Sequence, residues 1–441
     1  MHTTGLTNAS SSRRKRLFIT AAAAFATYFC MYAFRKPFTA ATFEDQTVFG
    51  LKLKVTLVIA QLLGYLISKF IGIKVVSEMS RRYRTAAILG LVLIAETALV
   101  GFAIVPTPWK VVMMFINGLP LGMVFGLVLS YLEGRRQTEA LSAALCASFI
   151  ISSGVVKTVG QWLLLHAGVS EFFMPMLAGL LFLPPLFLSV YFLHSTPPPD
   201  DFDRLLRSER VAMDRAKRQQ FLAAYWPGMI LLVLVYVAVT VIRTVRDDFG
   251  VEIWRDLGVN ESPFVFSVTE TVVAVVVTGL NALAILIQDN MRAIRVAIGL
   301  MAASFIGVAG SAVLYQGGQL TPFLFMVACG IGLYVPYVAY HTTVFERLIA
   351  ASRRPCNLGF LMYVADAVGY LGYAIVIVLK TWIDSPARIL PFFLWTLLCV
   401  GSLSIVALLL SGVYFEKRLL DDRVRRMEDS TPTSEELVPM E

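Results

Sequence analysis

The sequence has few charged residues for its length. Of its 441 residues, 15% are charged and 57% are hydrophobic, and the mean hydropathy is +0.71. A soluble globular domain carries about 25% charged residues, so this composition excludes that class. The longest stretch without an apolar run is about 30 residues, near 195–224, which leaves no room for a soluble catalytic domain. The sequence therefore predicts a membrane protein.

Several motifs are also missing. The chain has no Gly-Lys dipeptide, so it cannot form the phosphate-binding loop of an ATP-driven pump. It has neither His-Glu-x-x-His nor a nucleophile elbow, which argues against an intramembrane enzyme. The five cysteines are odd in number and lack Cys-x-x-Cys spacing, so no disulfide framework or zinc site is predicted. We expect no metal, no cofactor and no enzymatic activity.

Apolar runs of transmembrane length fill most of the chain. A helix that crosses a bilayer needs about 20 residues, and twelve runs meet this length. A charged segment separates the first six runs from the last six, and short similarities between the two sets suggest a duplication. We predict an all-α membrane protein with twelve transmembrane helices in two six-helix halves. The runs lie near 17–42, 51–73, 85–105, 111–132, 140–165, 172–194, 225–245, 262–287, 293–315, 321–346, 357–380 and 389–412.

Basic residues gather in alternate loops. Assigning loops to alternate sides places 26 Lys and Arg on one side and about six on the other. The positive-inside rule puts the richer side and both termini in the cytoplasm. We expect a monomer in an inner (plasma) membrane. This pattern also makes nucleic acid an unsuitable partner. The predicted parts are a cytoplasmic N-terminal segment 1–16, a first half 17–194, a linker 195–224, a second half 225–412 and a disordered cytoplasmic tail 413–441.

Ionisable residues lie inside several of the apolar runs. Each costs about 2.5 to 3.5 kcal/mol at a helix centre, so such residues usually face a cavity or a partner. The sixth, ninth and twelfth runs have none in their interiors, and the third has only Glu96. The first, second, fourth, fifth, seventh, eighth, tenth and eleventh runs are therefore predicted to line an aqueous path. The candidates are Arg35, Lys36, Lys69, Lys157, Arg243, Glu270, His341 and Asp366.

Tyrosines share helix faces with these charges. Tyr32 lies three residues before Arg35, and Tyr65 lies four before Lys69. Tyr337 stands in the same relation to the histidine of the tenth run. Tyrosine stripes usually pack helices together, but stripes that end in a charge favour a binding cavity.

Simpler explanations remain for some of the charges. Lys36 and Lys69 could extend their ammonium groups to the membrane surface. His341 is as well explained as a hydrogen-bonded core residue as a proton carrier. Arg35 and Arg243 could belong to structural ion pairs, although no acid in the first run can pair with Arg35.

Two motifs in the first half resemble a known family. The sequence YFCMYAFRKPF from Tyr28 is similar to the Tyr-x-x-Arg-Lys-x-Phe pattern of the organophosphate:phosphate antiporter branch of the major facilitator superfamily. The sequence YLISKF from Tyr65 resembles the Tyr-x-x-Ser-Lys-Phe of that branch. The resemblance implies that Arg35 and Lys36 match the basic pair of the branch and that Lys69 matches its lysine.

The second half is less similar. Arg243 followed by Asp248 resembles the second phosphate-binding arginine and its acidic neighbour, with Arg246 as the competing choice. The segment SPFVFSVTE from Ser262 resembles the one that ends in the acidic residue of the branch, which implies this role for Glu270. The helix 5 histidine of the branch has no counterpart here, where Ser152 and Ser153 precede an added Lys157.

These observations favour a secondary transporter of a small organic anion, such as a phosphate ester exchanged for phosphate. Two arginines suit a dianion because they stay charged and offer paired donors. The alternatives are a proton-coupled symporter or exporter, and a non-transporting membrane sensor. Predicted substrate contacts are Arg35, Arg243, Lys69, Tyr32, Tyr65, Lys157, His341 and Tyr337, and predicted gating or ion-pair residues are Lys36, Glu270, Asp366 and Asp248.

Depth along the helices predicts two ion pairs between the halves. Counted from the run boundaries, Lys157 and Glu270 lie at similar depth near the outer face. By the same arithmetic Lys69 can reach Asp366 near the cytoplasmic face.

The topology is testable by fusion. We expect a cytoplasmic reporter signal at both Ser208 and Glu441, because the positive-inside rule retains both segments on the basic side. Activity-based reporters fused at the two sites measure it, and an external signal at either site contradicts the twelve-span topology.

Overall fold

A computed structural model describes residues 18–44, 46–132, 138–196, 215–259, 262–353, 358–383 and 389–429. The predicted segment 1–16 and the part of the linker at 197–214 lie outside these residues. The described part is helical apart from a hairpin of strands β1 (Thr47–Val48) and β2 (Leu51–Lys52). This confirms the predicted all-α membrane class.

Ten helical segments are long and apolar enough to cross a membrane. The apolar helix Phe18–Phe34 and α14 (Leu358–Ile383) accompany them, and the count of twelve spans stays a prediction. The helices that contain the ten segments are α2 (Leu53–Glu78), α3 (Arg81–Ile104), α4 (Thr107–Leu132), α5 (Thr138–Leu165), α6 (Met174–His194), α8 (Arg215–Asp248), α10 (Phe264–Ile285), α11 (Asn290–Gln316), α12 (Pro322–Ala339) continued by α13 (Phe345–Ser352), and α15 (Ile389–Asp429).

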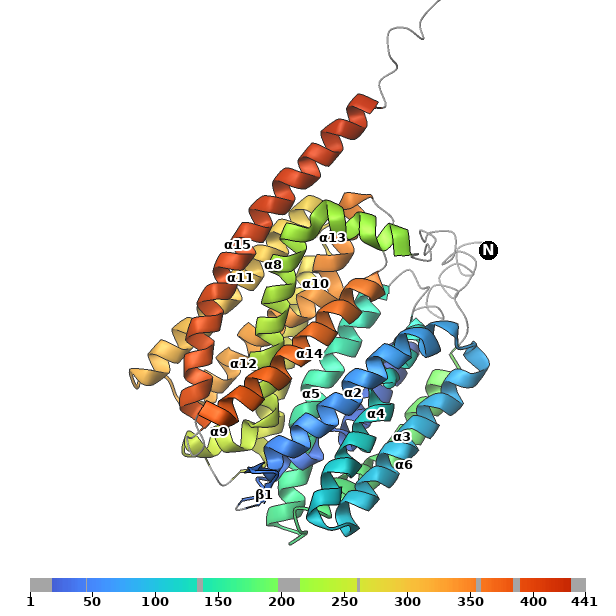
Figure 1. Cartoon of the computed structure of the whole chain (residues 1–441), viewed down its shortest axis with the longest axis vertical. Helices are drawn as coiled ribbons and strands as arrows, with labels where there is room; N and C mark the ends of the chain where they lie inside the picture. The colour runs from blue at the N-terminus through green and yellow to red at the C-terminus, as the bar shows by residue number, and fades with distance from the viewer. Residues whose placement is uncertain are drawn as a thin grey trace, which may run out of the picture.

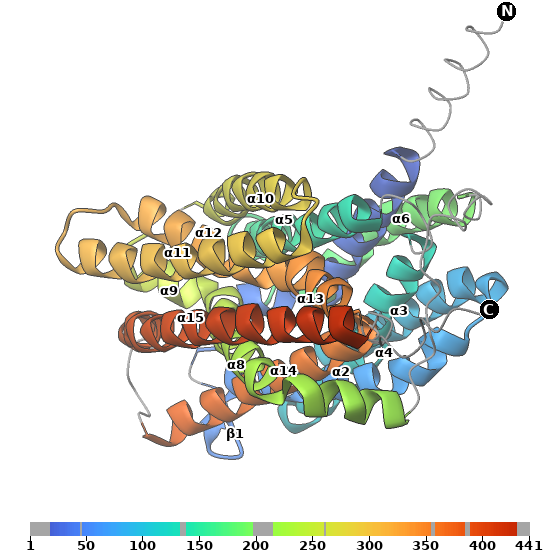
Figure 2. The same cartoon turned by 90° about the horizontal axis from the view of Figure 1, so that it is seen from above.

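The helices form two groups. Figure 1 shows the helices up to α6 on one side and those from α8 onward on the other, and Figure 2 shows the same division from above. Within the first group α4 packs against α2 and α3, and within the second α15 packs against α8 and α11. The most extensive contacts between the groups are those of α5 with α10 and of α2 with α14. These pairs set the interface on which the central residues lie.

The two ends of the bundle differ. The short helix α9 (Gly250–Asp256) and the β1–β2 hairpin cover one end, called the outer end because the charge distribution predicts that it faces away from the cytoplasm (Figure 1). At the other end, called the inner end, lie α13 and the long extension of α15.

The first apolar run, predicted as one helix over 17–42, is broken in the structure. The helix ends in a 3₁₀ turn at Tyr32–Phe34, and a second 3₁₀ turn follows at Pro37–Ala40. Pro37 has no amide hydrogen and so cannot continue the helical hydrogen bonds. The side-chain amide of Gln61 donates to the Arg35 carbonyl at 2.8 Å, and that of Asn117 donates to the Phe34 carbonyl at 2.9 Å. The break therefore presents Arg35 and Lys36 from a fixed backbone.

Two helix boundaries and one internal turn also differ from the predictions. Helix α8 begins at Arg215 and ends at Asp248, so it extends beyond the run 225–245 in both directions. Helix α15 continues to Asp429, past the point where a disordered tail is predicted, through a segment of Glu, Lys, Arg and Leu that favours helix. The tenth run contains a π-helical turn at Tyr340–Val344, a feature frequent at functional sites.

Close packing of α2 on α4 depends on glycine. A Cβ atom at Gly118 would overlap the backbone carbonyl of Gln61, whereas a Cβ at Gly90 of α3 has no heavy atom within 4 Å. We expect Gly118→Ala to lower the free energy of unfolding by about 1 to 3 kcal/mol, because overpacking forces backbone shifts. Thermal unfolding in detergent measures it, with Gly90→Ala as the matched control. Equal melting temperatures for the two variants would contradict this packing.

Candidate functional site

A small cavity lies at the centre of the interface between the halves. It is lined by Tyr28, Tyr32, Arg35, Tyr65, Lys69, Phe125 and Phe149 of the first half and Tyr337, His341, Asp366 and Tyr370 of the second. Its volume is about 20 Å³, so the side chains almost fill it. The structure therefore brings together most of the predicted substrate contacts, in a closed conformation.

Two buried arginines face aromatic rings at this centre. The guanidinium carbon of Arg35 lies 3.9 Å from the ring centroid of Tyr65. That of Arg243 lies 4.2 Å from the centroid of Tyr337, which lines the cavity. Arg35 is 6% exposed and Arg243 is 5% exposed. The Nε atoms of both residues are buried and have no hydrogen-bond partner among the described residues. Neither forms an ion pair with an acid of the described residues, so both retain uncompensated charge.

Lys69 and Asp366 close the inner side of the cavity. Their ammonium and carboxylate groups form an ion pair between α2 and α14, as the depth arithmetic predicts. The Tyr236 hydroxyl of α8 also donates to Asp366. His341 lines the same wall, with its Nδ1 atom 2.8 Å from the carbonyl oxygen of Tyr337. The inner side thus carries a buried acid with cationic and phenolic partners.

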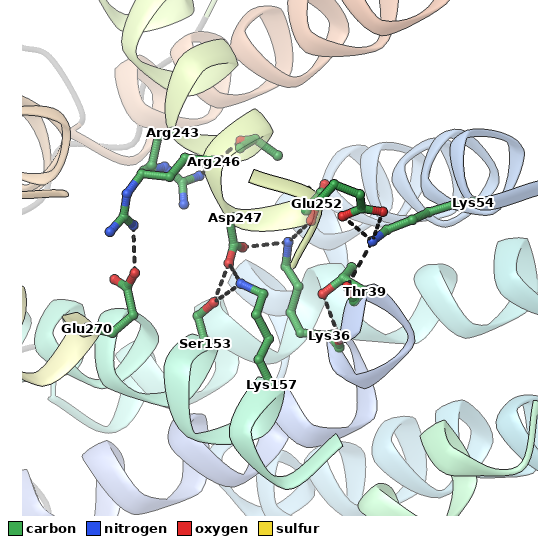
Figure 3. A network of polar contacts seen from close by, with 12 residues as sticks. Lys36, Thr39, Lys54, Ser153, Lys157, Arg243, Arg246, Asp247, Glu252 and Glu270 are labelled. Carbon is green, nitrogen blue, oxygen red and sulfur yellow. Dashed lines mark hydrogen bonds and ion pairs between the residues drawn. The ribbon is translucent and has the colours of Figure 1, made fainter. Parts of the chain in front are cut away.

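A second charge cluster closes the outer side (Figure 3). Asp247 of α8 lies between two lysines of the first half: Lys36 at 2.7 Å and Lys157 of α5, which it also contacts. The Ser153 hydroxyl donates to the same carboxylate. All of these residues are buried. One carboxylate of the second half therefore binds three polar groups of the first.

The neighbouring acids extend this cluster. Asp248 pairs with Lys36 and accepts a hydrogen bond of 2.9 Å from the Tyr373 hydroxyl. Glu252 of α9 pairs with Lys54 at 2.6 Å. In these contacts each lysine comes from the first half and each acid from the second, so the pairs join the halves across the outer end.

The predicted pair between Lys157 and Glu270 is wrong. Glu270 instead accepts a hydrogen bond of 2.6 Å from Arg246, within the second half, and Lys157 binds Asp247. Helices α5 and α10 do pack together, with Gly154 against the side chain of Glu270. The sequence therefore places Lys157 and Glu270 at similar depths in the membrane. Depth does not give the direction in which each side chain points, so the pairing was wrong.

Four residues of the outer cluster were missed by the sequence reasoning: Ser153, Asp247, Lys54 and Glu252 belong to no predicted site. Asp247 and Glu252 follow the apolar run 225–245, outside the segments in which a charge is unusual. Lys54 lies at the start of the run 51–73, where a charge near the membrane surface is ordinary. A signal was present in the sequence RTVRDD from Arg243, where two arginines and two acids occur within six residues of a membrane-length helix.

The chain is similar to known proteins in sequence and in structure. A family model described as "Family of unknown function (DUF5690)" matches residues 37–418. The chain belongs to this family. No curated protein matches the sequence. The crystal structure of a D-xylose-proton symporter is similar with a TM-score of 0.61 at 14% identity, over 89% of this chain and 96% of that one. The chain therefore shares the fold of this symporter, in agreement with the predicted fold of major facilitator type.

The outer pairs make a quantitative prediction. We expect Lys157→Gln and Asp247→Asn each to lower the melting temperature, because removing one partner leaves an unmatched buried charge that costs about 3 to 5 kcal/mol when fully desolvated. The double variant should be milder than the sum, with a coupling of about 0.5 to 3 kcal/mol in a thermal double-mutant cycle.

The pair Lys157→Gln with Glu270→Gln is the matched control, because the two residues do not form an ion pair. Its effects should add. Additivity of the Lys157 and Asp247 variants would contradict the observed pair.

Proposed function

We propose that the protein is a secondary active transporter of a small dianion, with a phosphate ester or inorganic phosphate as the substrate class. In this account the two halves bind the anion between them and expose it to the two sides of the membrane in turn. Exchange or an ion gradient supplies the energy.

One observation carries the proposal: Arg35 and Arg243, one from each half, are buried at the centre without a carboxylate partner among the described residues. Burying a charge without a counterion is costly, and aromatic faces offset only about 2 kcal/mol of that cost. A bound oxyanion would offset the remainder. Because each guanidinium offers paired donors, two of them match the charge and geometry of a phosphate.

The structure favours Arg243 over Arg246 as the binding residue. Arg246 donates to Glu270 at 2.6 Å and to the Met326 carbonyl at 3.0 Å, so its charge is already compensated. Apart from aromatic rings, Arg243 has one weak hydrogen bond among the described residues, of 3.4 Å to the Thr244 hydroxyl. This matches the resemblance of the chain to the organophosphate:phosphate antiporter branch.

Proton coupling is the second candidate. Asp366 and His341 lie on the wall of the cavity, and the structurally similar protein is named a D-xylose-proton symporter. A carboxylate that exchanges Lys69 for a proton would couple anion movement to pH. Transport that changes internal pH would support this mode, whereas strict one-for-one anion exchange would support antiport.

Conservative substitutions test the arginine site. We expect Arg35→Lys and Arg243→Lys to weaken phosphate or phosphate-ester binding by at least about tenfold, because lysine keeps the charge but loses the paired donors. A thermal-shift titration of the purified protein measures the affinity, since a ligand stabilises the folded state by mass action.

Arg246→Lys is the matched control and should bind like the parent, because lysine can still pair with Glu270. If both Arg35→Lys and Arg243→Lys bind every oxyanion as the parent does, the arginines are structural and the proposal fails.

A further inference from the structure

The first half presents a set of donors around the Asp247 carboxylate, called the oxyanion cradle and made of Lys36, Ser153 and Lys157. The Lys36 ammonium lies 2.7 Å from one carboxylate oxygen, and the other oxygen accepts from Lys157 and from the Ser153 hydroxyl. Ser153 and Lys157 lie one turn apart on α5, and the Lys157 ammonium donates to the Ser153 Oγ at 3.0 Å. Both carboxylate oxygens are therefore held by donors from a single half of the molecule (Figure 3).

The counterion of the cradle comes from the other half. Asp247 and Asp248 belong to α8, and within the described ranges no acid of the first half pairs with Lys36 or Lys157. A conformation that separates the halves at the outer end would break the contacts of Asp247 on α8 with Lys157 and Ser153 on α5. The cradle would then hold two lysines without a partner in the protein, next to external solvent. Two ammonium groups so close together favour binding of an anion.

We propose that Asp247 is a built-in substitute for an external ligand, and that the opened cradle is a binding subsite for a dianionic oxyanion such as phosphate. The carboxylate shows by its own contacts that the cradle fits a compact anionic group. In the closed conformation it competes with the external anion and displaces it.

The subsite differs in position from the arginine site. Asp247 follows Arg243 by four residues on α8, which is about 6 Å along the helix axis toward the outer end. Lys36 follows Arg35 directly in the chain. An anion held by the cradle would thus be one helical turn from the two arginines, on the route from outside. This inference rests on the proposed function only in assuming that the outer end opens.

The first experiment exposes the cradle by substitution. In the full chain carrying Arg35→Gln and Arg243→Gln, which removes the central site, we expect Asp247→Asn to raise the affinity for inorganic phosphate at least tenfold. Adding Lys157→Gln should abolish the gain, and acetate should bind more weakly than phosphate because it carries one charge. Equilibrium binding of radiolabelled phosphate measures each variant. Absence of the gain, or its survival in the Lys157→Gln variant, overturns the proposal.

A second experiment retains Asp247 and so avoids an unpaired cradle in the folded protein. In the otherwise unchanged chain, Ser153→Cys is exposed to a membrane-impermeant thiol reagent from outside, with inorganic phosphate as the probe. We expect phosphate to slow the labelling several-fold, and to have no effect when Lys157→Gln is also present. Equal protection in both variants, or protection in neither, contradicts the cradle.

The two proposals fail separately. If anion binding does not depend on the two arginines, but Asp247→Asn still raises the affinity for phosphate, the central site is rejected and the cradle is supported. If binding depends on the arginines, but Asp247→Asn does not raise the affinity for phosphate, the central site is supported and the cradle is rejected.

Discussion

The closed outer end of the molecule depends on acids of α8 and α9 that neutralise lysines of the first half. Lys36, Lys54 and Lys157 are all buried, and their counterions come from the other half. A buried ammonium group without a counterion is unstable, so the halves must either stay together at this end or supply another anion. The charge arrangement thus ties the conformation of the interface to the presence of anions.

At the centre of the interface, buried positive charges lack, among the described residues, the counterions that the lysines have. Within the part of the chain that the structure describes, Arg35 and Arg243 are buried without an acid partner. The lysines on the outer side and Lys69 on the inner side each have one. The interface therefore holds two uncompensated charges between two compensated layers. Such an arrangement costs stability in the empty protein, and a bound dianion would recover that cost. This is the physical reason to read the centre as a binding site rather than as packing.

Much of the fold could be predicted from composition and periodicity, because the cost of burying charge in a bilayer restricts where helices begin and end. The break after Phe34 could also have been predicted, since Pro37 ends the helical hydrogen bonds. Central residues such as Arg35, Lys69 and Asp366 were identified because a charge in an apolar run is rare. The partner of Lys157 was not identified, because the run boundaries give the depth of a residue to within several Å and contain no information about rotation about the helix axis. Asp247 was missed since it follows the apolar run that ends at residue 245, although α8 continues through it.

Counterflow in proteoliposomes tests whether a dianion crosses the membrane between Arg35 and Arg243. Vesicles loaded with inorganic phosphate, or with a single phosphate ester, receive the same compound in labelled form outside. We expect at least one of these anions to accumulate only when the vesicles are preloaded, and we expect Arg35→Gln and Arg243→Gln each to abolish the accumulation. If a neutral sugar is exchanged instead, and both arginine variants exchange it at the rate of the parent, the account is contradicted.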